Sequence, residues 1–153
     1  MGGFLRRARG KINLKTRFYF LAGAILIFAD QAAKYFAYAG KFGGFLNYGK
    51  PAISEKILPN YNFAFGIAAP KLLGYAAYGL IALFALRWFL KQKQKSELLK
   101  ISFTLIAAGA VSNIIDRVAL GYVRDFIYVF WGNVINFADI FITAGVILLL
   151  FAA

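Results

Sequence analysis

Four long apolar runs constrain the fold of this chain more than any other feature. They cover about residues 18–39, 72–90, 98–117 and 134–153. Each run is close to the ~20 residues that an α-helix needs to cross the hydrocarbon of a bilayer. Hydrophobic residues make up 61% of the chain, which is more apolar surface than a soluble domain of 153 residues could bury. The sequence therefore predicts an all-α integral membrane protein with four transmembrane helices.

The net charge of +12 could indicate a nucleic-acid partner, but the positions of the basic residues favour a membrane topology. Six of them lie within residues 1–17, and five more lie between Arg87 and Lys100, where the second and third runs are joined. Lysine and arginine collect in cytoplasmic segments. We therefore expect two cytoplasmic termini, a basic arm over 1–17 that lies on anionic lipid, and no nucleic-acid partner.

The first run has a second interpretation. A basic arm, an apolar core and the small residues Ala37 and Ala39 could together form a cleavable signal peptide. Asp30 and Lys34 interrupt the apolar core, and three further runs follow it. The transmembrane interpretation is therefore the one we carry forward.

Residues 40–70 form a connection of different composition. Glycine, proline, asparagine and aromatic residues divide it into short apolar stretches, which is typical of strands and turns. We expect a small extracytoplasmic β-rich segment on the membrane surface, and it could cradle a substrate. Its aromatic residues could equally form the interfacial belt that membrane proteins carry without any substrate. With this segment included, 1–153 is a single membrane domain.

Four aspartates lie in or beside the apolar runs, and in the predicted topology all of them fall toward the outer side. They are Asp30, Asp116, Asp125 and Asp139. A charge inside a membrane segment is costly, so each one marks a candidate functional site. Asp30 lies four residues before Lys34, so the two can pair on one helix face.

Polar residues of the third run share a helix face in the same way. Asp116 and Arg117 follow Asn113 by three and four residues, so an amide, a carboxylate and a guanidinium lie close together on one helix face. An Asp116–Arg117 network that orders the outer connection is as plausible as a catalytic role for either residue.

Asp125 and Asp139 have no cation one helical turn away, while Asn136 lies one turn before Asp139. Two carboxylates in a low-dielectric site share one proton and titrate as a pair. One can act as a base on water while the other polarises a carbonyl group. The chain has no cysteine and no histidine, which excludes thiol nucleophiles, serine–histidine triads and metal sites built on those residues. We expect no metal and no cofactor.

Four short motifs connect these polar residues in chain order. They are DQAAK (30–34), NYNFAFG (60–66), NIIDRVALGYVRDF (113–126) and NFAD (136–139). In this order they resemble the motifs of the lipoprotein signal peptidases (signal peptidase II), four-span aspartic peptidases of the bacterial cytoplasmic membrane. The third block keeps every fixed position of the family. The departures are Ala33 for a usual Thr or Ser, Asn62 for Gly and Ser112 for a common Gly.

The resemblance implies hydrolysis of the peptide bond before the diacylglyceryl-modified cysteine of a prolipoprotein, near the outer leaflet. Asp125 and Asp139, which match the family's catalytic positions, would form the catalytic pair. The other matched residues would support this pair or hold the substrate; they are Asp30, Lys34, Asn60, Asn113, Asp116, Arg117 and Asn136. The implied partners are the prolipoprotein substrate and membrane lipid, with no obligate protein partner.

Two other classes of protein remain as alternatives. A small proton-coupled or ion-conducting membrane protein would use the aspartates as relay sites, but it needs polar residues at several depths. The inner halves of the runs carry little that ionises apart from flanking lysine and arginine. A scaffold whose aspartates only make ion pairs would leave Asp125 and Asp139 unexplained.

Overall fold

The structure is a computed structural model that describes residues 14–39, 53–61, 83, 87, 89–92, 96–129 and 134–152. Its long helices are α1 (Leu14–Tyr38), α3 (Glu97–Leu120) and α4 (Phe137–Ala152), and its strands are β1 (Ile53–Asn60), β2 (Val123–Tyr128) and β3 (Val134–Ile135). Residues 83, 87 and 89–91 are also helical. The remainder of the predicted span 72–90 lies outside the described residues, as do 40–52 and 62–70 of the predicted β-rich segment. Of the predicted basic arm 1–17, residues 1–13 also lie outside them, and the last four residues belong to α1.

The helices have the character of membrane segments. Thr16–Tyr38 and Glu97–Leu120 are long and apolar enough to cross a bilayer, and α4 is a shorter apolar helix of 16 residues. Large hydrophobic side chains are exposed on their outer faces, among them Phe20 at 71% and Val118 at 82%, while charged side chains are buried between them. Lipid around the helices accounts for this reversal of the usual soluble pattern.

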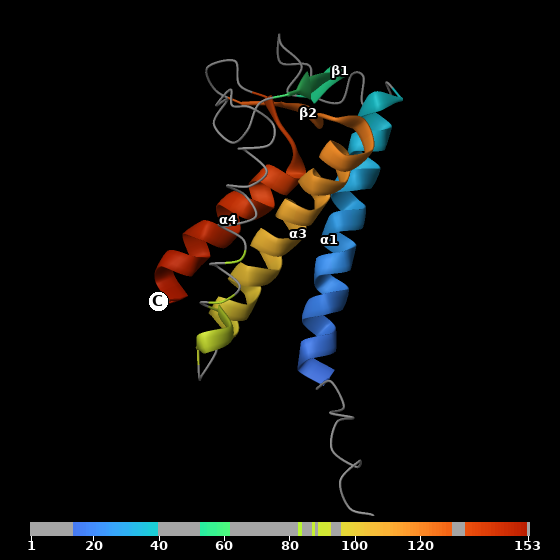
Figure 1. Cartoon of the computed structure of the whole chain (residues 1–153). Helices are drawn as coiled ribbons and strands as arrows, with labels where there is room; N and C mark the ends of the chain where they lie inside the picture. Colours follow the sequence, from blue (N-terminus) through green and yellow to red (C-terminus); the bar gives the residue numbers. More distant parts are fainter. Residues whose placement is uncertain are drawn as a thin grey trace, which may run out of the picture.

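α3 packs closely against α1 and α4. α1 and α3 run in the same direction, and α4 runs back along α3 (Figure 1). A Cβ atom on Gly109 would lie 2.4 Å from the carbonyl oxygen of Ala138, and one on Gly145 would lie 2.8 Å from that of Ser102. Glycine is required at both positions because it lets the α3 and α4 backbones approach.

The small sheet covers the end of the bundle where α1 and α3 finish and α4 begins (Figure 1). Its order is β1-β2-β3, and both pairs are antiparallel. β1 comes from the predicted β-rich segment 40–70, whereas β2 and β3 come from the connection that follows α3. α4 begins at Phe137, after the predicted boundary at 134, because Val134 and Ile135 pair with β2 instead of joining the helix.

The sheet is fixed to α1 by an apolar cluster. Ala33, Ala37 and Phe126 are buried together, and Phe137 packs on them with its ring perpendicular to that of Phe126 at 5.6 Å between centroids. Gly121 allows the chain to turn from α3 into β2, because its φ of 81° is a left-handed conformation that suits glycine. These contacts set the position of Asp125, the residue that precedes Phe126.

Candidate active site

A set of polar side chains is buried where the sheet meets the helices. They come from α1, α3, β2 and the start of α4: Asp30, Lys34, Ser112, Asn113, Asp116, Asp125 and Asn136. Asp139, half-buried, and Asn60, at the end of β1, complete the set. Throughout the described residues, no buried side-chain nitrogen or oxygen atom lacks a hydrogen-bond partner. A satisfied network of this kind holds its members in fixed orientations.

Asp125 lies in β2 and is only 2% exposed. Its Oδ2 accepts a hydrogen bond from Nδ2 of Asn60 at 2.9 Å, and its Oδ1 accepts one from Nδ2 of Asn136 at 2.6 Å. Burial raises the pKa of this carboxyl group to about 6; the two amide hydrogen bonds oppose the shift, and the nearby charge of Asp139 adds to it. Asp125 can therefore exchange a proton near neutral pH.

Asp139 is held by the first turn of α4. Oδ1 of Asn136 accepts from the backbone N–H of Asp139 at 3.0 Å, and Oδ2 of Asp139 accepts from the backbone N–H of Asn136 at 3.3 Å. This reciprocal pair is a capping box with an aspartate at its third helical position. Because the oxygen of the Asn136 amide is used by the cap, its nitrogen faces Asp125. One side chain thus contacts both proposed catalytic residues.

Asn113 connects Asp139 to the buried cation. Its Nδ2 donates to Oδ1 of Asp139 at 2.9 Å, and its Oδ1 accepts from Nζ of Lys34 at 2.9 Å. An ammonium group can only donate, so the amide oxygen must face Lys34 and the amide nitrogen must face Asp139. The charge of Lys34 therefore determines which way Asn113 presents its donor.

Asp30 joins α1 to the start of α4. The predicted Asp30–Lys34 ion pair is present at 2.7 Å, with both side chains fully buried. Asp30 also accepts from the backbone N–H of Ala138 at 2.9 Å and from the hydroxyl group of Ser112 at 2.6 Å. A carboxylate at a helix N-terminus is stabilised by the helix dipole. Asp30 therefore anchors the helix that carries Asp139.

Asp116 has two cationic partners. It pairs with Arg124 at 2.6 Å and with Lys34 at 3.2 Å. Neither pairing was expected from the sequence, because both partners lie outside α3. Arg117 contributes its carbonyl oxygen to the end of α3, where it accepts from the N–H of Gly121 at 3.0 Å.

Sequence reasoning missed three members of the network. Gln31 donates to both Ser112 and Asp116, Ser112 donates to Asp30, and Arg124 pairs with Asp116. Gln31 and Arg124 both lie inside the motif blocks, each next to an aspartate, and that adjacency was the available signal. Ser112 was noted only as a departure from a common glycine.

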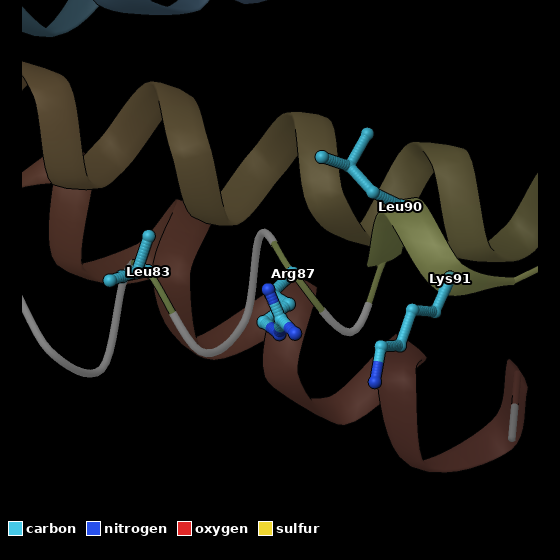
Figure 2. Close-up of a pocket in the computed structure, with 4 residues that line it drawn as sticks. All are labelled: Leu83, Arg87, Leu90 and Lys91. Carbon is cyan, nitrogen blue, oxygen red and sulfur yellow. The ribbon is translucent and has the colours of Figure 1, made fainter.

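The features that could hold another ligand are few. In the segments that the structure describes, no three acidic side chains group closely enough to hold a metal ion. A separate surface hollow is lined by Leu83, Arg87, Leu90 and Lys91 (Figure 2). These four residues include no acid, so the hollow is distinct from the carboxylate site.

Apolar helices that bury a carboxylate cluster at one end are typical of a membrane protein with a functional polar site. Residues 22–153 match the family described as Signal peptidase (SPase) II, and the chain belongs to this family. The match confirms the resemblance of the four motifs, and the membrane character and the peptidase class follow with it.

Individual relatives agree with the assignment. A lipoprotein signal peptidase of Acinetobacter baumannii is 35% identical over 141 residues, covering 82% of this chain and 77% of the relative. That of Bartonella henselae is 37% identical over 137 residues, covering 84% of each. A solved structure described as a bacterial membrane enzyme has a TM-score of 0.72 at 30% identity and covers 89% of this chain and 87% of that one.

Proposed function

We propose that this protein is an aspartic endopeptidase that cleaves the bond before the diacylglyceryl-modified cysteine of prolipoproteins, with Asp125 and Asp139 as its catalytic pair. The observation that carries the proposal is the position of Asn136, whose side chain donates to Asp125 and accepts from the backbone of Asp139. The charge of Asp139 also contributes to the raised pKa of Asp125, which supports two carboxyl groups that interact and titrate as a pair. The names of the relatives support the substrate class.

The chemistry needs only the two carboxylates and water. One carboxylate removes a proton from water as the oxygen attacks the scissile carbonyl carbon, and the protonated partner donates to the carbonyl oxygen. When the tetrahedral intermediate collapses, the carbon–nitrogen bond breaks and the proton taken from water passes to the leaving amine. The products are a signal peptide with a new carboxylate and a lipidated cysteine with a free amino group.

Supporting roles follow from the contacts. Asn60 and Asn136 orient Asp125, whereas Asn113 and Asn136 orient Asp139. Behind them, Asp30, Lys34 and Asp116 form a buried layer of paired charges. Arg117 supports the end of α3 through its backbone carbonyl oxygen, which accepts from the N–H of Gly121. Tyr61 and Tyr122, whose rings lie 5.5 Å apart beside Asn60, would contact the substrate near the interface.

The membrane arrangement belongs to the same proposal. Four transmembrane helices over about 18–39, 72–90, 98–117 and 134–153, with both termini in the cytoplasm, would place the sheet and the carboxylates at the outer leaflet of the cytoplasmic membrane. The basic residues before the first span and between the second and third support this orientation. A lipidated substrate could then keep its acyl chains in the outer leaflet while its scissile bond reaches the site.

An ion-relay function is not favoured. A relay needs ionisable groups at several depths, but α3 carries no charged residue between Lys100 and Asp116, and α4 carries none beyond Asp139. The buried charges gather at one end of the helices instead.

The proposal is tested by cleavage of a diacylglyceryl-modified prolipoprotein with purified protein in detergent. Asp125→Asn and Asp139→Asn should each lower kcat by about 10²–10⁴-fold, the usual contribution of a general acid or base. Glu97→Gln is the matched control, because it makes the same change at an exposed carboxylate on the first turn of α3. Retained activity in either aspartate variant would remove that residue from catalysis.

A further inference from the structure

Arg124 ties β2 to two different helices. Its Nη2 donates to Oδ1 of Asp116 on α3 at 2.6 Å and to Oε1 of Gln31 on α1 at 2.7 Å. Nε of Arg124 also faces the Asp116 carboxylate, at 3.2 Å and 3.3 Å from its two oxygens. Gln31 closes the ring by donating to Asp116 at 3.1 Å. A planar guanidinium group suits this role because it can hold several acceptors in fixed directions.

The backbone of Arg124 is held by the same carboxylate. Its N–H donates to Oδ2 of Asp116 at 3.0 Å. On the β1 side, the residue opposite Arg124 is Pro59, which has no N–H to donate, and on the other side β3 pairs only with Ile127 and Tyr128. Asp116 therefore takes the place of a strand partner at this point of β2.

This attachment acts directly on the neighbouring residue. Successive side chains of a strand point to opposite faces, so Arg124 faces Asp116 while Asp125 faces Asn60 and Asn136. A shift of the strand at Arg124 would move the Asp125 carboxylate by a similar amount.

Asp116 is also connected to the carboxylate of Asp139, through Lys34 and Asn113. It pairs with Lys34 at 3.2 Å, Lys34 donates to Asn113 at 2.9 Å, and Asn113 donates to Asp139 at 2.9 Å. We propose that Arg124 is a positioning residue of the peptidase, which sets the separation of Asp125 and Asp139 by holding β2 against α1 and α3. The inference rests on the proposed function and adds to it a residue outside the catalytic pair and its amide donors.

The test compares Arg124→Ala, Arg124→Lys, Gln31→Ala and the double variant Gln31→Ala/Arg124→Ala in steady-state cleavage of the lipidated prolipoprotein. Rates are expressed per mole of monodisperse, folded protein. Lys91→Ala removes an exposed cation outside the site and serves as the control.

We expect Arg124→Ala to lower kcat about 10–100-fold, as small misplacements of reacting groups do. KM should stay within about twofold, because substrate binding is unaffected. Arg124→Lys should recover part of the loss, since it can pair with Asp116 but cannot also hold Gln31 in the same plane. The double variant should be no slower than Arg124→Ala, because both changes break one ring. Lys91→Ala should match the parent.

Three results would overturn the proposal: an unchanged kcat in Arg124→Ala, an equal loss in Lys91→Ala, or losses that multiply in the double variant. If Arg124→Ala does not fold, Gln31→Ala and Arg124→Lys decide the question, since unchanged kcat in both contradicts the proposal. Asp125→Asn is run in the same series. Activity in that variant, or none in the parent, would contradict the proposed function instead.

Discussion

The side chains of Asn136 and Asp139 each accept a hydrogen bond from the backbone N–H of the other residue, across the first turn of α4. The distances are 3.0 Å to Oδ1 of Asn136 and 3.3 Å to Oδ2 of Asp139. The NFAD motif is therefore both a helix cap and a means of fixing a carboxylate. Because the same Asn136 amide reaches Asp125, the start of one helix determines the geometry of the pair. The residues that begin α4 thus also orient the two proposed catalytic carboxylates.

Replacing Asn136 by alanine should affect stability and activity together. Loss of an N-cap costs about 0.5–2 kcal/mol, and a buried carboxylate that loses a donor costs about 1–3 kcal/mol more. Thermal unfolding and kcat should therefore both fall in Asn136→Ala. Ser96→Ala is the matched control, because Ser96 caps α3 through the N–H of Leu99 at 3.1 Å, away from the site. It should lower the unfolding temperature alone; full activity in Asn136→Ala would contradict the bridging role.

The raised pKa of Asp125 predicts how stability changes with pH. Its pKa rises from 3.8 in an unperturbed group to about 6, so the folded protein keeps a proton that the unfolded chain releases. This stabilisation is complete below 3.8 and is lost as pH rises through about 6. The unfolding temperature of Asp125→Asn relative to the parent should therefore rise between about pH 4 and pH 7. A difference that does not change over this range would contradict the buried state of Asp125.

Lys34→Met should be strongly destabilising. Lys34 is fully buried between Asp30 and Asp116, and breaking a buried ion pair costs about 3–5 kcal/mol because a charge is left without compensation. Lys100→Met is the control: its pair with Glu97 is partly exposed and contributes about 0–1 kcal/mol. The free energy of unfolding in detergent is measured for both lysine variants. Adding Asp30→Asn to Lys34→Met should recover part of the lost stability. Equal effects of the two lysine changes would be inconsistent with the buried network.

Gly109→Ala should disturb the packing of α3 on α4. The new Cβ would lie 2.4 Å from the Ala138 carbonyl oxygen, so the helices must separate, at a cost of about 1–3 kcal/mol for an overpacked contact. Because Ala138 precedes Asp139, kcat should fall as well. At Gly23 a Cβ atom would meet only Thr104, at an ordinary 3.7 Å, so Gly23→Ala should be neutral or slightly stabilising. Cleavage rates and unfolding temperatures of both variants test this.

Much of the fold is readable from the sequence because its signals are local. Apolar runs predict α1 and α3, glycine and proline punctuation predicts a strand in 40–70, and the four-residue spacing predicts the Asp30–Lys34 pair. The capping box was also within reach, because an asparagine three residues before an acid at the start of an apolar run is its pattern. NFAD was interpreted only as a catalytic motif, so its role as a helix cap was not predicted.

The missed contacts depend on distant segments. Arg124 meets Asp116 only because Gly121 turns the chain back, and it meets Gln31 only because β2 lies over α1. Ser112 and Gln31 are far apart in the sequence and hydrogen-bond across two helices. Spacing rules within one helix cannot predict such partners, since they follow from how the elements pack.

The ion pairs also imply an order of assembly. Asp30 and Lys34 neutralise each other within α1, so that helix can enter lipid with its charges already paired. Asp116 on α3 is different, since both of its cations come from elsewhere: Lys34 from α1 and Arg124 from β2. Asp116 is compensated only once α1 has docked and β2 has folded over it. Docking of α1 against α3 and closure of the sheet are therefore coupled, and both follow the pairing of charges within α1.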